Sequence, residues 1–136
     1  RKKIRIRHYD GDIDNSYLEV KISSPEGKFK QSQKIDKNLK KKYLTRGYVD
    51  RKYGYCKPVI RISYDRVYYK LDKMRITLDN NIKYEHYYSK NSILEKMSVV
   101  ELKSISNKEL IKIDELLPLS RQRFSKYSRA CLELNV

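Results

Sequence analysis

The sequence predicts an α+β fold dominated by antiparallel strands, with short helices that include one at the C-terminus. Apolar and polar residues alternate along most of the chain, which is typical of strands whose two faces meet different surroundings. Turn-forming Asp, Asn, Gly and Pro residues separate these stretches. A helical period appears only near the end of the 136 residues, and no change of composition divides the chain, so we expect a single domain over residues 1–136.

The first part of the chain predicts three strands joined by two turns. Ile4 and Ile6 alternate with Lys3, Arg5 and Arg7, which gives the first strand one apolar face and one cationic face. The expected elements are a strand at 2–9, a turn at 10–15, a strand at 16–23, a turn at 24–27 and a strand at 28–35.

Residues 36–57 have no clean period, so we expect a solvated connection with a short helix there. The alternation resumes at Pro58 and predicts further strands in PVIRISYDR, VYYKL, KMRITLDNNI and KYEHYYS, with a turn at 79–81. A last strand is expected in MSVVELKSI.

Two helices are expected at the end of the chain. Ser106 and Glu109 form a capping box before an apolar helical period that Pro118 closes. A terminal helix starting near Ser125 is indicated by the helical spacing of Phe124, Tyr127, Cys131 and Leu134.

The charge of +15 predicts a polyanionic partner, and it leaves nucleic acid, phosphorylated small molecules, polyphosphate and anionic membrane open. No apolar run approaches the roughly 20 residues that span a bilayer. We therefore expect a soluble, cytoplasmic protein without a membrane segment of its own. Cys56 and Cys131 lack metal-ligand spacing and are expected to be structural.

Several predicted strands carry charged residues at every second position, so each set shares one face of its strand. In a closed or strongly curved sheet these sets could converge on one lumen; alternatively, they face water. The sets are Arg5 with Arg7, Glu19 with Lys21, Tyr64 with Arg66, Arg75 with Thr77 and Asp79, and Glu101 with Lys103.

Crowded cations are unfavourable unless an anion compensates them, and arginine suits phosphate because its planar fork binds two oxygens. Carboxylates beside phosphates, here Glu19 and Glu101, are how Mg²⁺ or Mn²⁺ is held. These groups together predict phosphoryl transfer.

The segments KIRIRHY, YLEVK, SYDRVYY, MRITLD, VVELK and RFSKY, in this order, resemble the polyphosphate polymerase domain of the vacuolar transporter chaperone (VTC) group, within the CYTH-like triphosphate tunnel metalloenzymes. The resemblance implies an antiparallel β tunnel that binds ATP or polyphosphate and a glutamate-held Mn²⁺ or Mg²⁺. Catalytic members transfer the γ-phosphate of ATP to a growing polyphosphate chain. The resemblance implies no specific nucleic acid and leaves protein partners undefined.

The resemblance also implies roles for individual residues, each at the position that matches a motif. It assigns Glu101 to the metal. It assigns phosphate binding to Arg5, Arg7, Lys21, Arg66, Arg75, Ser125 and Lys126, with Tyr64, Glu19 and Lys103 in support.

Three features depart from the family pattern. The opening helix and first tunnel strands are not found before Arg1, so we expect a C-terminal portion whose tunnel needs those strands to close. The tunnel-facing basic residue of the third strand is open among Lys28, Lys30 and Lys34. The second strand has only E-x-K, at Glu19 to Lys21, where the CYTH branch has E-x-E-x-K. This difference argues against a small-molecule triphosphatase.

Three functions therefore remain: a polyphosphate polymerase, a non-catalytic polyphosphate or triphosphate binder, and a nucleic-acid binder that stacks bases on tyrosines. Simpler roles also remain for single residues. Glu101 could be a surface partner of Lys103, and Tyr64 could be packing. Lys126 opposes the dipole of its helix, which favours an anion at that N-terminus.

Overall fold

The computed structural model describes residues 2–71, 74–104, 111, 120 and 122–136, which form two compact units, Arg1–Pro58 and Val59–Val136. Strands dominate both units, and every strand pair is antiparallel. The predicted sheet-dominated fold is confirmed. None of the sheets formed by the described residues closes on itself, so the tunnel and the single domain stay predictions.

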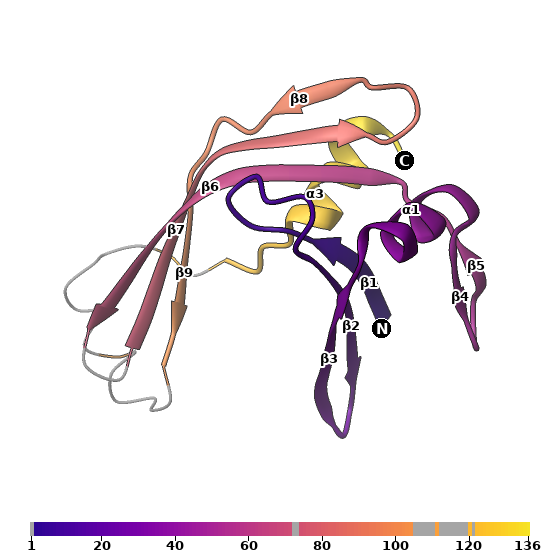
Figure 1. The fold of residues 1–136 in the computed structure, drawn as a ribbon. Coiled ribbons are helices and arrows are strands. Elements are labelled where there is room, and N and C mark those ends of the chain that lie inside the picture. The colour runs from indigo at the N-terminus through magenta and orange to yellow at the C-terminus, as the bar shows by residue number, and fades with distance from the viewer. Residues whose placement is uncertain (1, 72–73, 105–110, 112–119, 121) are drawn as a thin grey trace. The chain divides into compact units, whose positions relative to one another are not determined.

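The N-terminal unit opens with a three-stranded sheet, as the alternation predicts. β1 (Lys2–Arg7), β2 (Ser16–Ser24) and β3 (Gly27–Ile35) pair in the order β1-β2-β3 (Figure 1). Arg5 and Glu19 are directly opposite each other in the register of the first two strands. The sheet therefore places a carboxylate on its central strand beside a cation of its edge strand.

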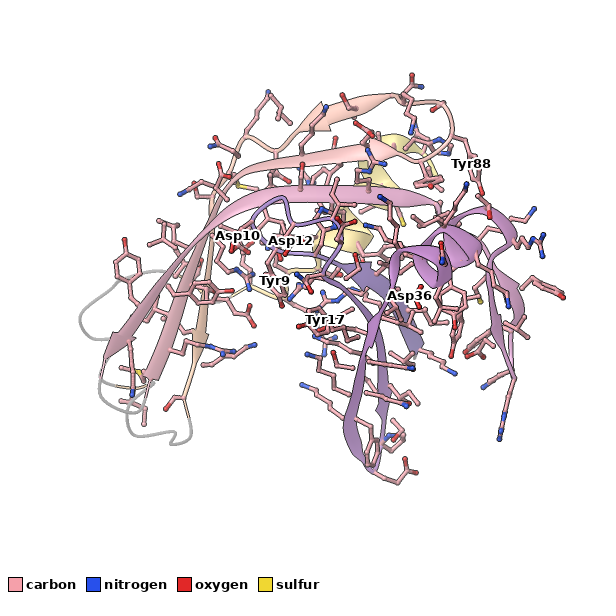
Figure 2. The ribbon with its side chains drawn as sticks, in the orientation of Figure 1. Tyr9, Asp10, Asp12, Tyr17, Asp36 and Tyr88 are labelled. Atoms are coloured by element: carbon pink, nitrogen blue, oxygen red, sulfur yellow. The ribbon has the colours of Figure 1, made fainter. Side chains whose placement is uncertain are left out.

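The connection after this sheet contains the expected short helix and one element that was not expected. α1 (Lys37–Arg46) begins after Asp36 (Figure 2), whose carboxylate accepts a backbone N–H at 2.7 Å, and ends before Gly47, which has a φ of 94°. A hairpin of β4 (Tyr48–Asp50) and β5 (Gly54–Cys56) follows. The expected short helix is therefore confirmed, but the sequence does not predict the hairpin, because strands of three residues are too short to show alternation.

The C-terminal unit is built on one long hairpin. β6 (Ile60–Leu71) and β7 (Met74–His86) pair along their whole lengths. The other edge of β7 is divided between two short strands (Figure 1). β8 (Ser92–Leu94) pairs with residues 83–85, and β9 (Val99–Lys103) pairs with residues 75–79.

The predicted turn at residues 79–81 is wrong, because β7 continues through this segment with a β-bulge. Only Tyr64 of β6 lies between the pairs Ser63 with Lys83 and Asp65 with Asn80, whereas β7 has two residues there. Asn81 takes a φ of 51°, a left-handed conformation that asparagine tolerates better than most residues. The asparagines at 80–81, which suggest a turn in the sequence, therefore form a bulge within the strand.

The bulge joins two chemically different regions on one face of the hairpin. One region, here called the apolar half, is formed by Ile60, Ile62, Ile82 and Tyr84, and the last two are fully buried. The other, here called the polar half, shares that face by register. It consists of Arg66, Tyr68 and Lys70 of β6, Arg75, Thr77 and Asp79 of β7, and Glu101 and Lys103 of β9.

The C-terminal helix is confirmed. α3 (Lys126–Leu134) begins after Ser125, whose hydroxyl accepts the backbone N–H of Ser128 at 3.4 Å. Its Ala130 is buried in the core of the apolar half, so this half anchors the helix. The helix expected from Ser106 lies largely outside the described residues. Within the described ranges, no helix is long and apolar enough to cross a membrane.

Candidate functional site

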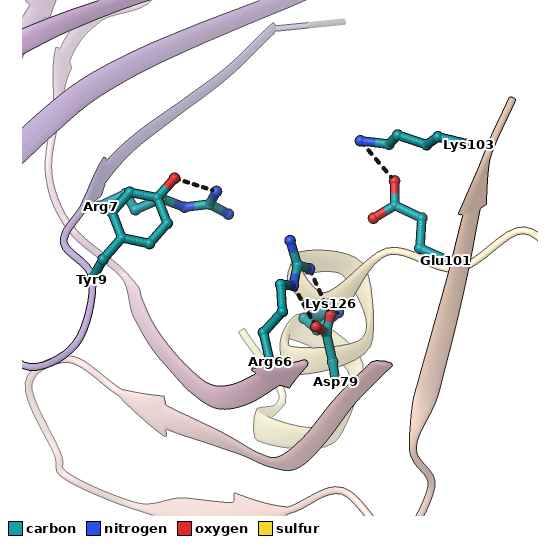
Figure 3. Close-up of polar contacts among 7 residues, drawn as sticks. All are labelled: Arg7, Tyr9, Arg66, Asp79, Glu101, Lys103 and Lys126. Atoms are coloured by element: carbon teal, nitrogen blue, oxygen red, sulfur yellow. Dashed lines mark hydrogen bonds and ion pairs between the residues drawn. The ribbon is translucent and has the colours of Figure 1, made fainter. Parts of the chain in front are cut away.

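The best-defined group of functional side chains surrounds Asp79 on the polar half. Arg66 donates two hydrogen bonds to its carboxylate, from Nε to Oδ1 at 2.5 Å and from Nη2 to Oδ2 at 2.7 Å (Figure 3). Lys126 Nζ lies 2.5 Å from Oδ2. These three residues, here called the Asp79 cluster, join β6, β7 and the first turn of α3.

Aromatic rings hold both cations of the Asp79 cluster in place. The ring of Tyr64 lies 5.1 Å from Arg66 Cζ and 4.9 Å from Lys126 Nζ. Phe124 adds a second ring 5.7 Å from the ammonium of Lys126. Because a cation is attracted to the face of an aromatic ring, these contacts fix the side chains beyond what the carboxylate alone would do. Tyr64 therefore contacts two of the predicted phosphate ligands.

The electrostatics of the cluster favour the charged forms of Asp79 and Arg66. Burial would raise the pKa of Asp79, but the hydrogen bonds from Arg66 and Lys126 outweigh it and lower its pKa. The hydrogen bond to Asp79 in turn raises the pKa of Arg66. Two cations on one carboxylate leave one net positive charge. An anion does lie beside Lys126 at the N-terminus of α3, and it is the side chain of Asp79.

Arg75 and Thr77 continue the polar half along β7, but their surroundings differ from those of Asp79. Arg75 is exposed and makes no ion pair with another described residue. Thr77 is only 3% exposed, yet its hydroxyl has no hydrogen-bond partner among the described residues. With respect to the described residues, the polar half therefore has a cation without an ion pair beside a hydroxyl without a hydrogen-bond partner.

The expected metal ligand, Glu101, lies on β9 directly opposite Thr77. Its carboxylate accepts from Lys103 Nζ at 3.1 Å, so the simple pairing that the sequence allowed does form (Figure 3). No group of three His, Cys, Asp or Glu side chains that could hold a metal occurs in the described part of the chain. A single carboxylate still fits Mg²⁺ or Mn²⁺, which commonly combine one or two carboxylates with substrate phosphates.

The N-terminal unit has a second cluster around a buried carboxylate. Glu19 is 2% exposed and accepts from Arg5 Nε at 2.5 Å and from Lys30 Nζ at 2.7 Å. Burial would raise the pKa of Glu19, but these hydrogen bonds lower it to about 2. These three residues are called the Glu19 cluster below. Glu19 is therefore a counterion of the cations in this unit.

The same face of the N-terminal sheet has more cations. Lys21 lies opposite Lys30 in the register, and desolvation together with the positive charge of Arg5 lowers its pKa. Arg7 Nη1 donates to the hydroxyl of Tyr9 at 3.1 Å. Lys28 and Lys34 share this face by register, so all three third-strand candidates lie on it, and Lys30 is the one that binds Glu19.

Sequence reasoning missed the importance of Asp79. The residue was placed correctly on the face of Arg75 and Thr77, but no role was assigned to it. A signal was available, because an aspartate within a strand whose neighbour strand offers an arginine is a pairing candidate. The partner could not be named, because the register of β6 and β7 depends on the bulge.

A family model for the VTC domain matches residues 1–135. The chain belongs to the VTC domain family. The match covers both compact units and confirms the resemblance inferred from the sequence motifs. A search of curated proteins and a search of solved structures each found no match. Membership in the VTC domain family relates this chain to polyphosphate polymerases, and the residues above supply the chemistry for a more specific proposal.

Proposed function

We propose that this VTC domain binds the triphosphate of ATP and a polyphosphate chain, and that it transfers the γ-phosphate of ATP to that chain. The observation that carries the proposal is the Asp79 cluster, which holds two predicted phosphate ligands from separate elements within hydrogen-bond distance of one carboxylate. Arg5, Arg7 and Lys21 of the N-terminal unit are proposed to contact phosphate as well.

Charge supports this assignment. The polar half contributes Arg66, Lys70, Arg75, Lys103 and the helix-borne Lys126 against two carboxylates, so an anion on this face is attracted. Phosphoryl transfer requires little covalent chemistry from the protein and depends on positioning and charge neutralisation. Side chains held in advance by ion pairs and rings suit that requirement, because little reorganisation is needed when phosphate binds.

The proposed roles follow from the type of each group. Arg75 binds phosphate oxygens through its guanidinium fork, and Arg66 binds them through the N–H groups that Asp79 does not use. Lys126 and Ser125 bind phosphate at the N-terminus of α3, where backbone N–H groups also favour an anion. Tyr64 and Asp79 keep the cations oriented.

A divalent metal, Mn²⁺ or Mg²⁺, is proposed to be held by Glu101 together with phosphate oxygens. When bound, it would neutralise charge on the transferred phosphoryl group. Lys103 would then exchange its ion pair with Glu101 for one with phosphate. This exchange costs little, since the pair is half exposed and exposed pairs are weak.

The test is synthesis of polyphosphate from ATP and Mn²⁺, followed as a ladder on a gel, with tripolyphosphate binding measured by calorimetry. Arg66→Ala should abolish the ladder and weaken tripolyphosphate binding at least tenfold, since a charged hydrogen-bonding group is lost. Arg61→Ala is the matched control, because Arg61 lies on the opposite face of β6 in an exposed pair with Glu85. Equal loss in both variants would contradict the assignment.

A binding module without catalysis is the second candidate, and the same experiment distinguishes it. Tripolyphosphate would then bind and raise the melting temperature, while no ladder forms at any metal concentration. Competition by single-stranded DNA of equal charge, at the same affinity as tripolyphosphate, would instead favour the nucleic-acid binder. Exposed Tyr53, Tyr55 and Tyr69 are the rings that such a binder would use.

A further inference from the structure

Thr77 has a buried hydroxyl that no other described residue engages. The residue is 3% exposed, and its Oγ1 has no hydrogen-bond partner among the described residues. A buried hydroxyl without a partner is costly, and each such group in a native structure requires an explanation. Valine has nearly the same shape without that cost and is a better strand former in such a place.

The position of Thr77 indicates what the hydroxyl is for. It is at the centre of the polar half, where the register places it opposite Tyr68 on one side and Glu101 on the other. Directly opposed residues of paired strands lie about 5 Å apart, and residues two apart on one strand lie about 7 Å apart. The hydroxyl is thus within reach of any ligand that spans Arg75 and the Asp79 cluster.

The carboxylates near Thr77 are already engaged by other groups. Asp79 accepts from Arg66 and Lys126, and Glu101 accepts from Lys103. Neither uses the threonine as a donor. Since no described residue accepts from the hydroxyl, a ligand with acceptor oxygens is the partner that suits it on this face.

The side chains that the register places beside Thr77 can move. Tyr68 is 57% exposed, and the side chains of Glu101 and Lys103 are 45% and 56% exposed. Long, exposed side chains change rotamer at little cost, so a ligand that draws Glu101 and Lys103 to itself would uncover the hydroxyl.

We propose that the Thr77 hydroxyl donates a hydrogen bond to a phosphate oxygen of the bound chain, at the phosphate that lies between Arg75 and the Asp79 cluster. This inference rests on the proposed phosphate binding. A hydroxyl on a rigid central strand would fix the register of the chain, whereas long cationic side chains follow it over several positions. Thr77 is thereby a specificity-determining residue rather than a source of charge.

The experiment compares Thr77→Val and Thr77→Ser by calorimetry with tripolyphosphate and by melting without ligand. Thr77→Val should bind about tenfold more weakly, while its melting temperature without ligand stays the same or rises. Thr77→Ser, which keeps the hydroxyl, should bind as the wild type does. Weaker binding without a loss of ligand-free stability in Thr77→Val separates a ligand contact from a structural hydrogen bond.

Three results would overturn the inference. Thr77→Val could bind like the wild type, its ligand-free melting temperature could fall, or Thr77→Ser could lose as much affinity as Thr77→Val. If the wild type itself does not bind tripolyphosphate, the proposed function is refuted, and so is the proposed hydrogen bond from Thr77 to phosphate. If the wild type binds tripolyphosphate and Thr77→Val binds it equally well, only the role of Thr77 is refuted.

Discussion

The Glu19 cluster and the Asp79 cluster, one in each unit of the chain, both neutralise closely spaced cations with a buried carboxylate. Each has a buried carboxylate on a central strand, an arginine directly opposite on the neighbouring strand, and a lysine from a third element. In each, the carboxylate keeps two cations close together without an external anion. The closely spaced cations are therefore tolerated without a bound ligand, because a carboxylate in each unit neutralises part of their positive charge.

The two clusters differ in how firmly the cations are held. Arg66 and Lys126 have side chains 19% and 18% exposed and are contacted by aromatic rings, whereas Arg5 and Lys30 are 31% and 50% exposed. Arg66 makes two hydrogen bonds to its carboxylate, and Arg5 makes one. The Asp79 cluster is therefore a rigid link between sheet and helix, whereas the Glu19 cluster holds its lysine in a more exposed ion pair.

The largest effect is expected for Asp79→Asn. Arg66 and Lys126 would be left as unpaired, largely buried cations, and breaking a buried ion pair from one side costs about 3 kcal/mol. The free energy of unfolding measured in urea should fall by about that amount. Asp14→Asn is the matched control, since its pair with Lys37 is exposed on both sides and should change stability little. A loss equal to that of the control would refute the rigid link.

A smaller effect is expected for Glu19→Gln, about 2 kcal/mol, because the cations it leaves unpaired are more exposed. If Glu19→Gln destabilises more than Asp79→Asn, the ranking of the two clusters is wrong.

The pH dependence of stability tests the Glu19 cluster separately. The folded pKa of about 2 lies below the ordinary value of 4.5, so the contribution of ionised Glu19 is complete above pH 4.5 and is lost as pH falls towards about 2. The wild type should therefore lose unfolding free energy across this window, and Glu19→Gln should lose less of it. Parallel curves for the two proteins would contradict the pKa assignment.

The smallest effect is expected at the start of α3. Ser125→Ala removes the cap and should cost about 1 kcal/mol. It should also weaken tripolyphosphate binding a few-fold, because Ser125 is a proposed phosphate ligand and Lys126 is the first residue of the helix. Asp36→Ala removes the equivalent cap of α1 and should cost a similar amount of stability with no change in affinity. Equal affinity in both variants would contradict phosphate binding at the start of α3.

Much of this arrangement could be predicted from alternation alone. The strands of Arg5, Glu19, Arg66 and Glu101 and the helix after Ser125 were predicted, because each has a period that runs for several residues. The predictions that failed concern two short segments. The hairpin at 48–56 is too short to show a period, and the bulge at Asn81 uses residues that also make turns.

The ion pairs could not be predicted from the sequence for a related reason. A pair such as Arg66 with Asp79 requires a register, and a register depends on the bulge and on contacts across the sheet. The sequence therefore identified which residues share a face of their own strand, while the structure identified which of them meet across strands.

The bulge at Asn81 also determines where β7 can lose one residue without a change in which side chains share a face. β7 has one residue more than β6 at this point, so a deletion at 80–81 would restore regular pairing and leave the polar and apolar halves on their common face. The same deletion between Arg75 and Asp79 would turn part of the polar half to the opposite face, since side chains alternate with a period of two. Loss of one residue is thus tolerable at 80–81 and destructive a few positions earlier, even though both changes shorten the same strand equally.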